Sequence, residues 1–247
     1  MGLIKTEALL LKKVNFRDSS TIIQFYTRDE GRVSIIAKGS RQIKSQYRGY
    51  LEPLTHLSII YYDKPTREIQ TLGKVDMIQN FVKDSRNVVA TYHGLAILEL
   101  INKMVHHNEE NQKLFQLTIH SLQYIDRYSE ESNIGLIVFL LHAIKTLGYQ
   151  IDFEHCQFCG HELRSFYFEE NNPQPVCAHC AGRHYDNITG EQLNWLRVIN
   201  ALNTGHPFQK IMEIKGNGKI INFLLCYAGM YFDFYPKLNS LELLRYF

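Results

Sequence analysis

The first eighty residues contain short runs of Val, Ile, Thr and Tyr, in which apolar and polar positions tend to alternate. A period of two in runs of this length predicts β-strands. Polar segments separate the runs, and one of them, Arg28 to Gly31, ends on a glycine that favours a tight hairpin turn. We therefore predict five strands, at residues 4–14, 21–27, 32–37, 54–62 and 67–75.

Five short strands so close together are typical of a small closed barrel. The OB-fold is the commonest five-stranded candidate. An SH3-like barrel would give much the same number of strands, and the pattern alone does not separate the two folds.

From about residue 84 the apolar positions recur every three or four residues, which predicts helices. Ser132 is a candidate N-cap for the third helix, and Gly148 a candidate for its end. Thr189 and Gln192 fit a capping box. The predicted helices span residues 88–106, 111–128, 130–147, 189–202 and 219–235.

Four of the five cysteines form two C-x-x-C pairs, with seventeen residues between the pairs. This spacing is typical of a zinc ribbon, in which the two pairs supply the four corners of a tetrahedral site. Between the pairs, residues 163–169 alternate like a short strand and residues 171–173 turn the chain back. We predict one structural Zn²⁺ with the ligands Cys156, Cys159, Cys177 and Cys180.

Other interpretations of the cysteines are weaker. Disulfides need an oxidising compartment, and the first eleven residues lack the three regions of a signal peptide. A redox C-x-x-C usually opens a helix after a strand, whereas these pairs flank a predicted hairpin. Four thiolates already complete a tetrahedron and leave no position for an activated water. We therefore interpret the nearby histidines as surface residues or as supports of the ligands: His155, His161, His179 and His184.

The predicted fold class is α+β and multidomain. The expected domains are an OB-fold barrel at 1–80, a helical bundle at 81–150, a zinc-binding insert at 151–187, and C-terminal helices at 188–247 that pack with the bundle. Apolar residues make up 45% and charged residues 21%, as in ordinary globular proteins. No apolar run approaches the roughly 20 residues that cross a bilayer. We expect a cytoplasmic protein without a membrane partner.

Charge is distributed unevenly along the chain, although the net charge is only +2. Residues 1–80 hold thirteen Lys and Arg against eight Asp and Glu, and the remaining residues hold fourteen against seventeen. The basic first part suggests an anionic partner for that part alone.

The segment 38–49 is the most basic, with four cations and no acid among Gly, Ser and Gln residues. Such a loop suits phosphate oxygens, and Tyr47 and Tyr50 could offer ring faces to unstacked bases. A solvated surface loop is the alternative. Three further cations would extend the patch if the barrel brings them to one face. The candidate nucleic-acid contacts are Lys38, Arg41, Lys44, Arg48, Arg32, Lys12 and Arg17.

Common catalytic motifs are missing from the sequence. There is no P-loop, no G-x-S-x-G elbow and no H-E-x-x-H pair. The glutamate pairs at 109–110 and 130–131 have no second acidic cluster with which to share metals, so a two-metal nuclease is unsupported. We predict a protein that is not an enzyme. The alternative is a zinc-ribbon enzyme acting on nucleic acid, or a transcription-type factor.

Several stretches of the sequence resemble the RecO family of DNA repair and recombination mediator proteins. They are TEALLL at 6–11, DSS at 18–20, FYT at 25–27, GRV at 31–33, AKGSR at 37–41, KS at 44–45 and LEPL at 51–54. The cysteine pairs also fall after three predicted helices, where metal-binding members of the family carry them.

The resemblance implies an OB-fold barrel joined to a helical domain with a zinc-binding insert. It implies a nucleoid-associated protein that binds single- and double-stranded DNA and anneals complementary strands. Such proteins act with RecR to load RecA onto DNA coated by single-strand-binding protein, and they recognise the acidic, hydrophobic C-terminal tail of that coating protein. Some members lack the cysteines, which favours a structural metal. We expect the aromatic C-terminal helices to receive the tail.

Overall fold

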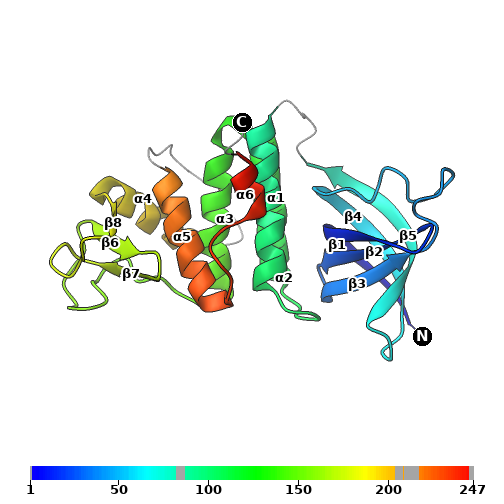
Figure 1. Ribbon diagram of the computed structural model, residues 1–247, viewed down its shortest axis with the longest axis horizontal. Coiled ribbons are helices and arrows are strands. Elements are labelled where there is room, and N and C mark those ends of the chain that lie inside the picture. The colour runs from blue at the N-terminus through cyan, green and yellow to red at the C-terminus, as the bar shows by residue number, and fades with distance from the viewer. Residues whose placement is uncertain (1, 82–86, 204–207, 209–216, 245–247) are drawn as a thin grey trace.

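The computed structural model describes residues 2–81, 87–203, 208 and 217–244. The molecule is elongated, as Figure 1 shows. A β-barrel lies at one end, helices form the middle, and a small sheet lies at the other end. The change of period predicted near residue 84 falls outside the described residues.

The barrel consists of five strands, as predicted. They are β1 (Gly2–Phe16), β2 (Ser20–Thr27), β3 (Gly31–Ala37), β4 (Thr55–Asp63) and β5 (Ile69–Asn80). The sheet closes in the order β1-β2-β3-β5-β4. All pairings are antiparallel except that of β3 with β5. A closed five-stranded barrel in this order is an OB-fold, which resolves the choice that the pattern left open.

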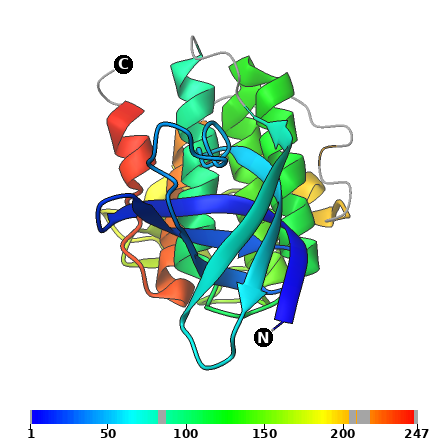
Figure 2. The same cartoon turned by 90° about the vertical axis from the view of Figure 1, so that its right-hand side faces the viewer.

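Buried and partly exposed side chains alternate along the strands, and the buried ones fill the barrel. In β3, every second residue from Gly31 to Ala37 is buried. Tyr47 reaches into the same core from the long loop between β3 and β4, so that loop covers one end of the barrel. Figure 2 looks at the barrel with the helices behind it.

Helices form the middle of the molecule. They are α1 (Val88–Met104), α2 (Gln112–Arg127), the 3-10 turn η1 (Ser129–Glu131), α3 (Ser132–Thr146), α4 (Gly190–Ala201), α5 (Asn217–Phe232) and α6 (Asn239–Leu243). Helix α3 is buried at every position from Ile134 to Ile144, which explains why it lacks a polar face. It packs against α1, α2 and α5 and forms the centre of the bundle.

The predicted helix ends are correct in two of three cases. Thr189 and Gln192 form the capping box, and Gly148 follows the end of α3 with a φ of 94°. Ser132 was predicted to cap α3, and this is wrong. Its hydroxyl instead contacts Nδ1 of buried His93 at 2.9 Å, and the preceding turn η1 leads the chain into the helix.

The cysteine segment forms a small sheet of β6 (Phe166–Glu169), β7 (Asn172–Val176) and β8 (Asp186–Ile188), in the order β7-β6-β8. The first two strands make the predicted hairpin, and β8 was not predicted. Phe166 and Phe168 pack edge-on against Phe223 of α5, with ring centroids 4.9 and 5.1 Å apart. The sheet therefore shares the core of the helices.

The barrel is joined to the helices by a continuous apolar core. Leu9, Tyr26, Leu54 and Phe81 belong to the cluster of buried residues that includes the helical core. A Cβ added at Gly31 would overlap the backbone of Glu109, in the loop between α1 and α2. Only glycine permits this close approach of the β2–β3 turn to that loop.

Candidate metal centre and nucleic-acid interface

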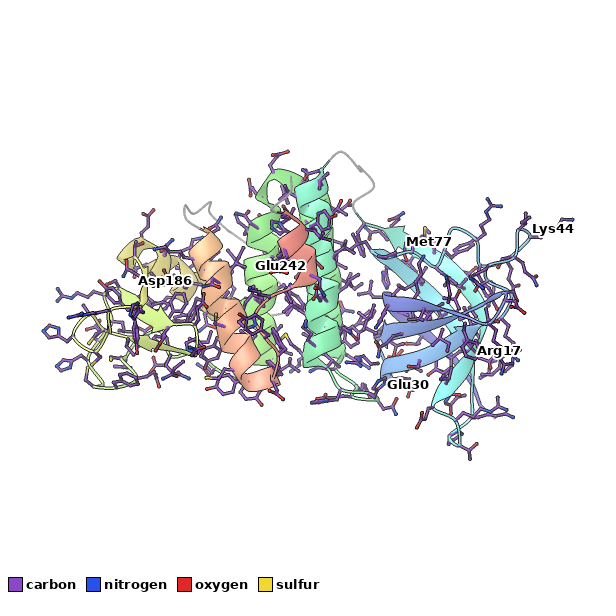
Figure 3. The ribbon with its side chains drawn as sticks, in the orientation of Figure 1. Arg17, Glu30, Lys44, Met77, Asp186 and Glu242 are labelled. Carbon is purple, nitrogen blue, oxygen red and sulfur yellow. The ribbon has the colours of Figure 1, made fainter. Side chains whose placement is uncertain are left out.

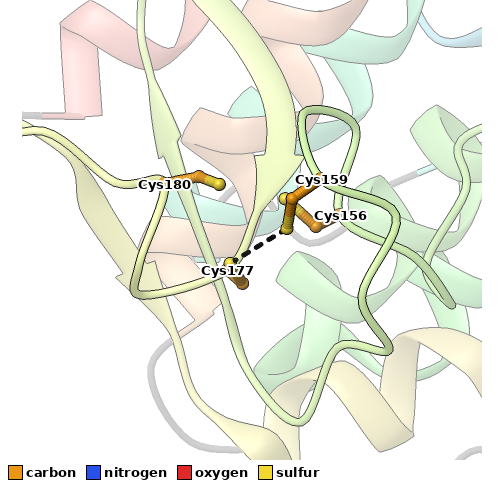
Figure 4. Close-up of side chains that lie close together, drawn as sticks. All are labelled: Cys156, Cys159, Cys177 and Cys180. Atoms are coloured by element: carbon orange, nitrogen blue, oxygen red, sulfur yellow. Dashed lines mark hydrogen bonds between the residues drawn. The ribbon is translucent and has the colours of Figure 1, made fainter.

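Four sulfur atoms converge in the cysteine segment, as Figure 4 shows. The Sγ atoms of Cys156, Cys159, Cys177 and Cys180 all lie within 4.8 Å of one another. Those of Cys159 and Cys177 are 3.6 Å apart. Tetrahedral coordination with Zn–S bonds of about 2.3 Å would separate sulfurs by about 3.8 Å. The spacing therefore fits a single tetrahedral metal ion.

Each pair of cysteines sits on a tight turn. In the first, Gly160 N–H donates to the carbonyl of Cys156 at 2.9 Å, and Gly160 has a φ of 73°. In the second, the N–H groups of Cys180 and Ala181 both donate to the carbonyl of Cys177 at 3.0 Å. These turns bring the two sulfurs of each pair onto one side of the chain.

The thiols have unequal acidities. Burial raises the pKa of Cys156, but backbone N–H groups of Cys177, Cys159 and Phe158 outweigh burial and lower it to about 6. The pKa of Cys180 is raised to about 12, chiefly by its hydrogen bond with the Cys159 sulfur. The first thiolate, at Cys156, thus forms easily, and its negative charge opposes the ionisation of the next thiol. A divalent cation would offset the repulsion and allow all four to ionise, so the donor set fits a thiolate-bound metal.

The base of the cysteine segment is fastened to α4. The guanidinium of Arg197 donates to the carbonyls of Phe153 at 2.9 Å and Leu163 at 3.1 Å. It also pairs with Glu154 at 2.9 Å. Sequence reasoning missed this residue, because nothing in the helical pattern distinguishes it from an ordinary surface cation.

The metal-ligand cluster among the described residues consists of the four cysteines alone. His161 Nδ1 lies 3.3 Å from the Cys159 sulfur, so this histidine supports a ligand. Four sulfurs close the site, and they leave no corner for a reacting water. The arrangement therefore favours a structural metal.

The basic loop between β3 and β4, residues 38–53, lies at the other end of the molecule. Figure 3 labels Lys44 on this loop and Arg17 in the β1–β2 turn, both at the end of the barrel farthest from the helices. Lys38 and Lys44 are exposed. Within the part of the chain that the structure describes, neither has a hydrogen bond or ion pair. Both ammonium groups are thus available to an external anion.

Arg41 and Arg48 are partly engaged within this end of the barrel. Arg41 Nη2 donates to the carbonyls of Arg17 and Asp18, each at 2.6 Å, and so ties the loop to the β1–β2 turn. Arg48 Nη1 donates to the carbonyl of Ile43 at 3.3 Å. Both side chains remain exposed, so each is positioned and still accessible.

Tyr47 does not offer a ring face to bases, contrary to the sequence interpretation. It is only 5% exposed, and its hydroxyl donates to the carbonyl of Leu72 at 3.1 Å. Tyr50 is half-buried. The most exposed apolar side chain of the loop is instead Ile43, which sequence reasoning missed because a single isoleucine among cations carries no motif.

Two other candidate contacts lie apart from the loop. Lys12 is exposed on β1. Arg32 points into the joint between barrel and helices, where its Nη1 donates to the carbonyls of Asn102 at 2.5 Å and Val105 at 2.7 Å, at the C-terminal end of α1. A cation there also complements the helix dipole. The structure thus gives Arg32 partners within the protein.

Acidic side chains gather near that joint. The pKa of Glu30 is raised, first by burial and then by the nearby charges of Asp63, Asp29 and Glu110. Figure 3 shows Glu30 on the side of the barrel nearer the helices, whereas Lys44 and Arg17 lie at the outer end. Glu30 is thus separated from Lys44 and Arg17. The one acid of the 38–53 loop, Glu52, pairs with Lys13 at 2.7 Å, so the loop keeps a net positive charge that favours an anionic partner.

None of the helices within the described ranges combines the length and apolar character needed to cross a membrane.

The fold and the two sites define a class of protein, in which an OB-fold barrel with a basic outer end is joined to helices that carry a four-cysteine insert. The model of the family described as "Recombination protein O N terminal" matches residues 1–81, and "Recombination protein O C terminal" matches residues 85–234. The chain belongs to the RecO family of DNA repair proteins.

Relatives named DNA repair protein RecO match most of the chain. The one from Thermoanaerobacter sp. (strain X514) is 27% identical over 222 residues, which cover 89% of this chain and 87% of the relative. The one from Caldicellulosiruptor bescii is 25% identical over 232 residues, 93% of each chain. The one from Chlorobium phaeobacteroides is 28% identical over 169 residues, 68% of this chain and 65% of the relative.

Proposed function

We propose that this protein is a non-enzymatic mediator of recombinational repair. It binds single- and double-stranded DNA at the outer end of the barrel and anneals complementary strands. With RecR it helps to load RecA onto DNA coated by single-strand-binding protein, in the cytoplasm and in association with the nucleoid. The observation that carries the proposal is the segregation of charge, with free cations on the 38–53 loop and acids near the joint.

Phosphate binding by this surface rests on Lys38, Lys44, Arg41 and Arg48, with Arg17 beside them, and Lys12 on β1 would extend it. Lysine and arginine neutralise phosphates without reading sequence, which suits a protein that must act on any strand. Neutralising both strands also removes the repulsion that opposes their pairing. Arg32 is not part of the proposed surface, because carbonyls within the protein already engage it.

The tail of the single-strand-binding protein is proposed to bind at the opposite side of the joint, on the C-terminal helices. A groove of about 260 Å³ lies between α5 and α6. Its apolar lining suits the hydrophobic part of such a peptide: Ile221, Leu225, Tyr235, Leu238 and Leu241. Lys237 is the cation available to the acidic part, and it would have to exchange its 3.9 Å ion pair with Glu242, which also lines the groove together with Glu170.

The metal is proposed to be one Zn²⁺. Four thiolates in a tetrahedron are the preferred donor set of structural zinc. Bound there, zinc supplies a cross-link between two turns and no reaction chemistry.

The loop is tested by replacing Lys38 and Lys44 with Ala together. These two side chains have no internal partner in the described chain, so their loss removes charge and leaves the loop contacts in place. Two neutralised phosphates on a single strand contribute roughly ten- to thirtyfold to affinity near 0.1 M salt. Fluorescence anisotropy with a labelled oligothymidine should show a loss of this size, and annealing should slow with it.

The matched control is the double variant K113A/R183A, which removes two exposed cations from α2 and from the cysteine segment. It should bind the oligonucleotide as the parent does. A labelled tail peptide should bind K38A/K44A normally, because its groove lies elsewhere. Equal DNA affinity in K38A/K44A and the parent would rule out the loop as the DNA surface.

A further inference from the structure

Ile43 is 85% exposed, more than any other large apolar side chain among the described residues. Single exposed apolar residues are common and by themselves indicate nothing. The position of Ile43 sets it apart, because it lies within the basic loop between Arg41 and Lys44. Residues 38–50 contain no acid.

The loop presents Ile43 on an ordered backbone. Consecutive turns are closed by Gln42 N–H donating to Gly39 O at 3.1 Å and by Ser45 N–H donating to Gln42 O at 3.0 Å. The carbonyl of Ile43 itself accepts from Arg48 Nη1. On either side of Ile43 the loop is anchored, by buried Tyr47 and by a 2.8 Å hydrogen bond between Ser40 and Thr21.

An apolar tip held in this way loses little conformational entropy when it is buried. Isoleucine is branched at Cβ, which restricts its first side-chain torsion. The backbone that carries it is already folded into turns, so binding does not have to order it. Transfer of the side chain from water into an apolar contact is then a net gain.

The neighbouring charges identify what would cover it. Cations on both sides of Ile43 would hold the phosphates of a strand, and those phosphates bring the bases within reach of the tip. Isoleucine has no hydrogen-bonding group, so it cannot read the donors and acceptors of a base edge. Architectural proteins insert apolar side chains between adjacent bases of duplex DNA, and the bases of a single strand can be separated in the same way.

We propose that Ile43 inserts between neighbouring bases of a single DNA strand and opens their stack. The inference rests on the proposed function, because the loop must first bind the phosphates. Its consequence for annealing is direct. A strand whose bases are held apart at one step presents its base-pairing edges to a second strand.

The test is Ile43→Ser, measured with an oligonucleotide that carries 2-aminopurine, whose fluorescence rises when its base is unstacked. The parent should raise the fluorescence on binding, and I43S should lose most of this rise at saturation. Affinity should fall about three- to tenfold, as expected for one partly buried aliphatic side chain. The dependence of affinity on salt should stay unchanged, because no charge is removed. I43L should restore the signal.

Controls separate this inference from the proposed function. V198S removes an apolar side chain that is 58% exposed on α4, and it should behave as the parent. Melting temperatures should agree among all variants, since Ile43 packs against little. If K38A/K44A weakens binding while I43S retains both affinity and fluorescence, the loop binds DNA but the insertion is wrong. If I43S instead loses only the binding of a protein partner, Ile43 is a protein contact and the proposal is overturned.

Discussion

At the scale of single residues, the four cysteines differ in burial although they share one site. Cys156 is buried, Cys159 is exposed, and Cys177 and Cys180 lie between these extremes. A substitution at Cys159 therefore removes a ligand with little loss of packing. This separates the effect of the metal from the effect of the core.

Cys159→Ser should reduce bound metal well below one ion per chain and lower the free energy of unfolding. Structural zinc contributes to folding directly, so the loss should reach several kcal/mol. Metal analysis and urea unfolding measure the two quantities. Cys226→Ala is the matched control, because Cys226 lies apart in α5 and should leave the metal content unchanged. Full stability of C159S with its metal gone would contradict a structural role.

His142 gives a second prediction at this scale. It is fully buried in α3, and burial, followed by the charge of Lys145, lowers its pKa to about 4. In the unfolded chain a histidine has a pKa of about 6.5. The unfolded state therefore takes up the proton first, so stability is complete above pH 6.5 and is lost as the pH falls toward 4.

Replacement of His142 by Leu should remove this contribution. When the pH falls from 7 to 5, the free energy of unfolding should decrease in both proteins. The decrease should be about 2 kcal/mol smaller in the variant than in the parent. Urea unfolding at the two pH values measures the difference. Buried His93, whose pKa is also lowered to about 4, leaves some acid sensitivity in the variant. Equal pH dependence in both proteins would show that His142 does not titrate in this way.

At the scale of elements, the joint between barrel and helices depends on the β2–β3 turn. Gly31 has a φ of 63° and lies directly against the backbone of Glu109. Next to it, Arg32 holds two carbonyls at the end of α1. Together with the shared apolar core, this turn fixes how the barrel is attached to the rest of the protein.

Gly31→Ala should destabilise the protein by about 1–3 kcal/mol more than Gly49→Ala. Gly49 also has a positive φ, of 81°, but a Cβ added there meets nothing within 4 Å. Both variants place alanine at a positive φ, so the difference between them reports chiefly the contact with Glu109. Equal unfolding free energies in urea would mean that the turn can move away from the helices at no cost.

Most of the elements could be predicted from the sequence because burial imposes a period on them. Strand β3 alternates from Gly31 to Ala37, and the capping box at Thr189 marks the start of α4. The cysteine spacing indicated the four-sulfur site for a similar reason. The two turns and the hairpin between them are local structure, so the spacing along the sequence sets which sulfurs meet. Ser132 was misassigned because its hydroxyl has a closer partner in another helix, and no local pattern reports that.

The candidate interface was harder to predict. The positive charge of the sequence indicated the loop, but it did not indicate which side chains of the loop face solvent. Tyr47 and Arg32 look like surface residues in the sequence, and tertiary packing places the first in the barrel core and the second in the joint. Ile43 is the opposite case. An apolar residue is expected in the core, but the turns of the loop hold its side chain in solvent.

At the scale of the whole molecule, the two sites lie at opposite ends of the long axis, as Figure 1 and Figure 3 show. The four-cysteine centre lies in the insert at one end, and the basic loop lies at the free end of the barrel. A strand bound there would leave the helices and the α5–α6 groove accessible. The shape therefore suits a protein that holds DNA with one end and a protein partner with another part.

The central claim is that the 38–53 loop holds DNA through its phosphates, and salt dependence tests it most directly. The measurement is the slope of log K against log salt concentration for an oligothymidine, in the parent and in K38A/K44A. Each lost phosphate contact reduces the slope by about 0.7, so the double variant should be shallower by about 1.4. The metal content should be equal in both proteins. Parallel slopes would contradict the account, because these two lysines would then not contact the strand.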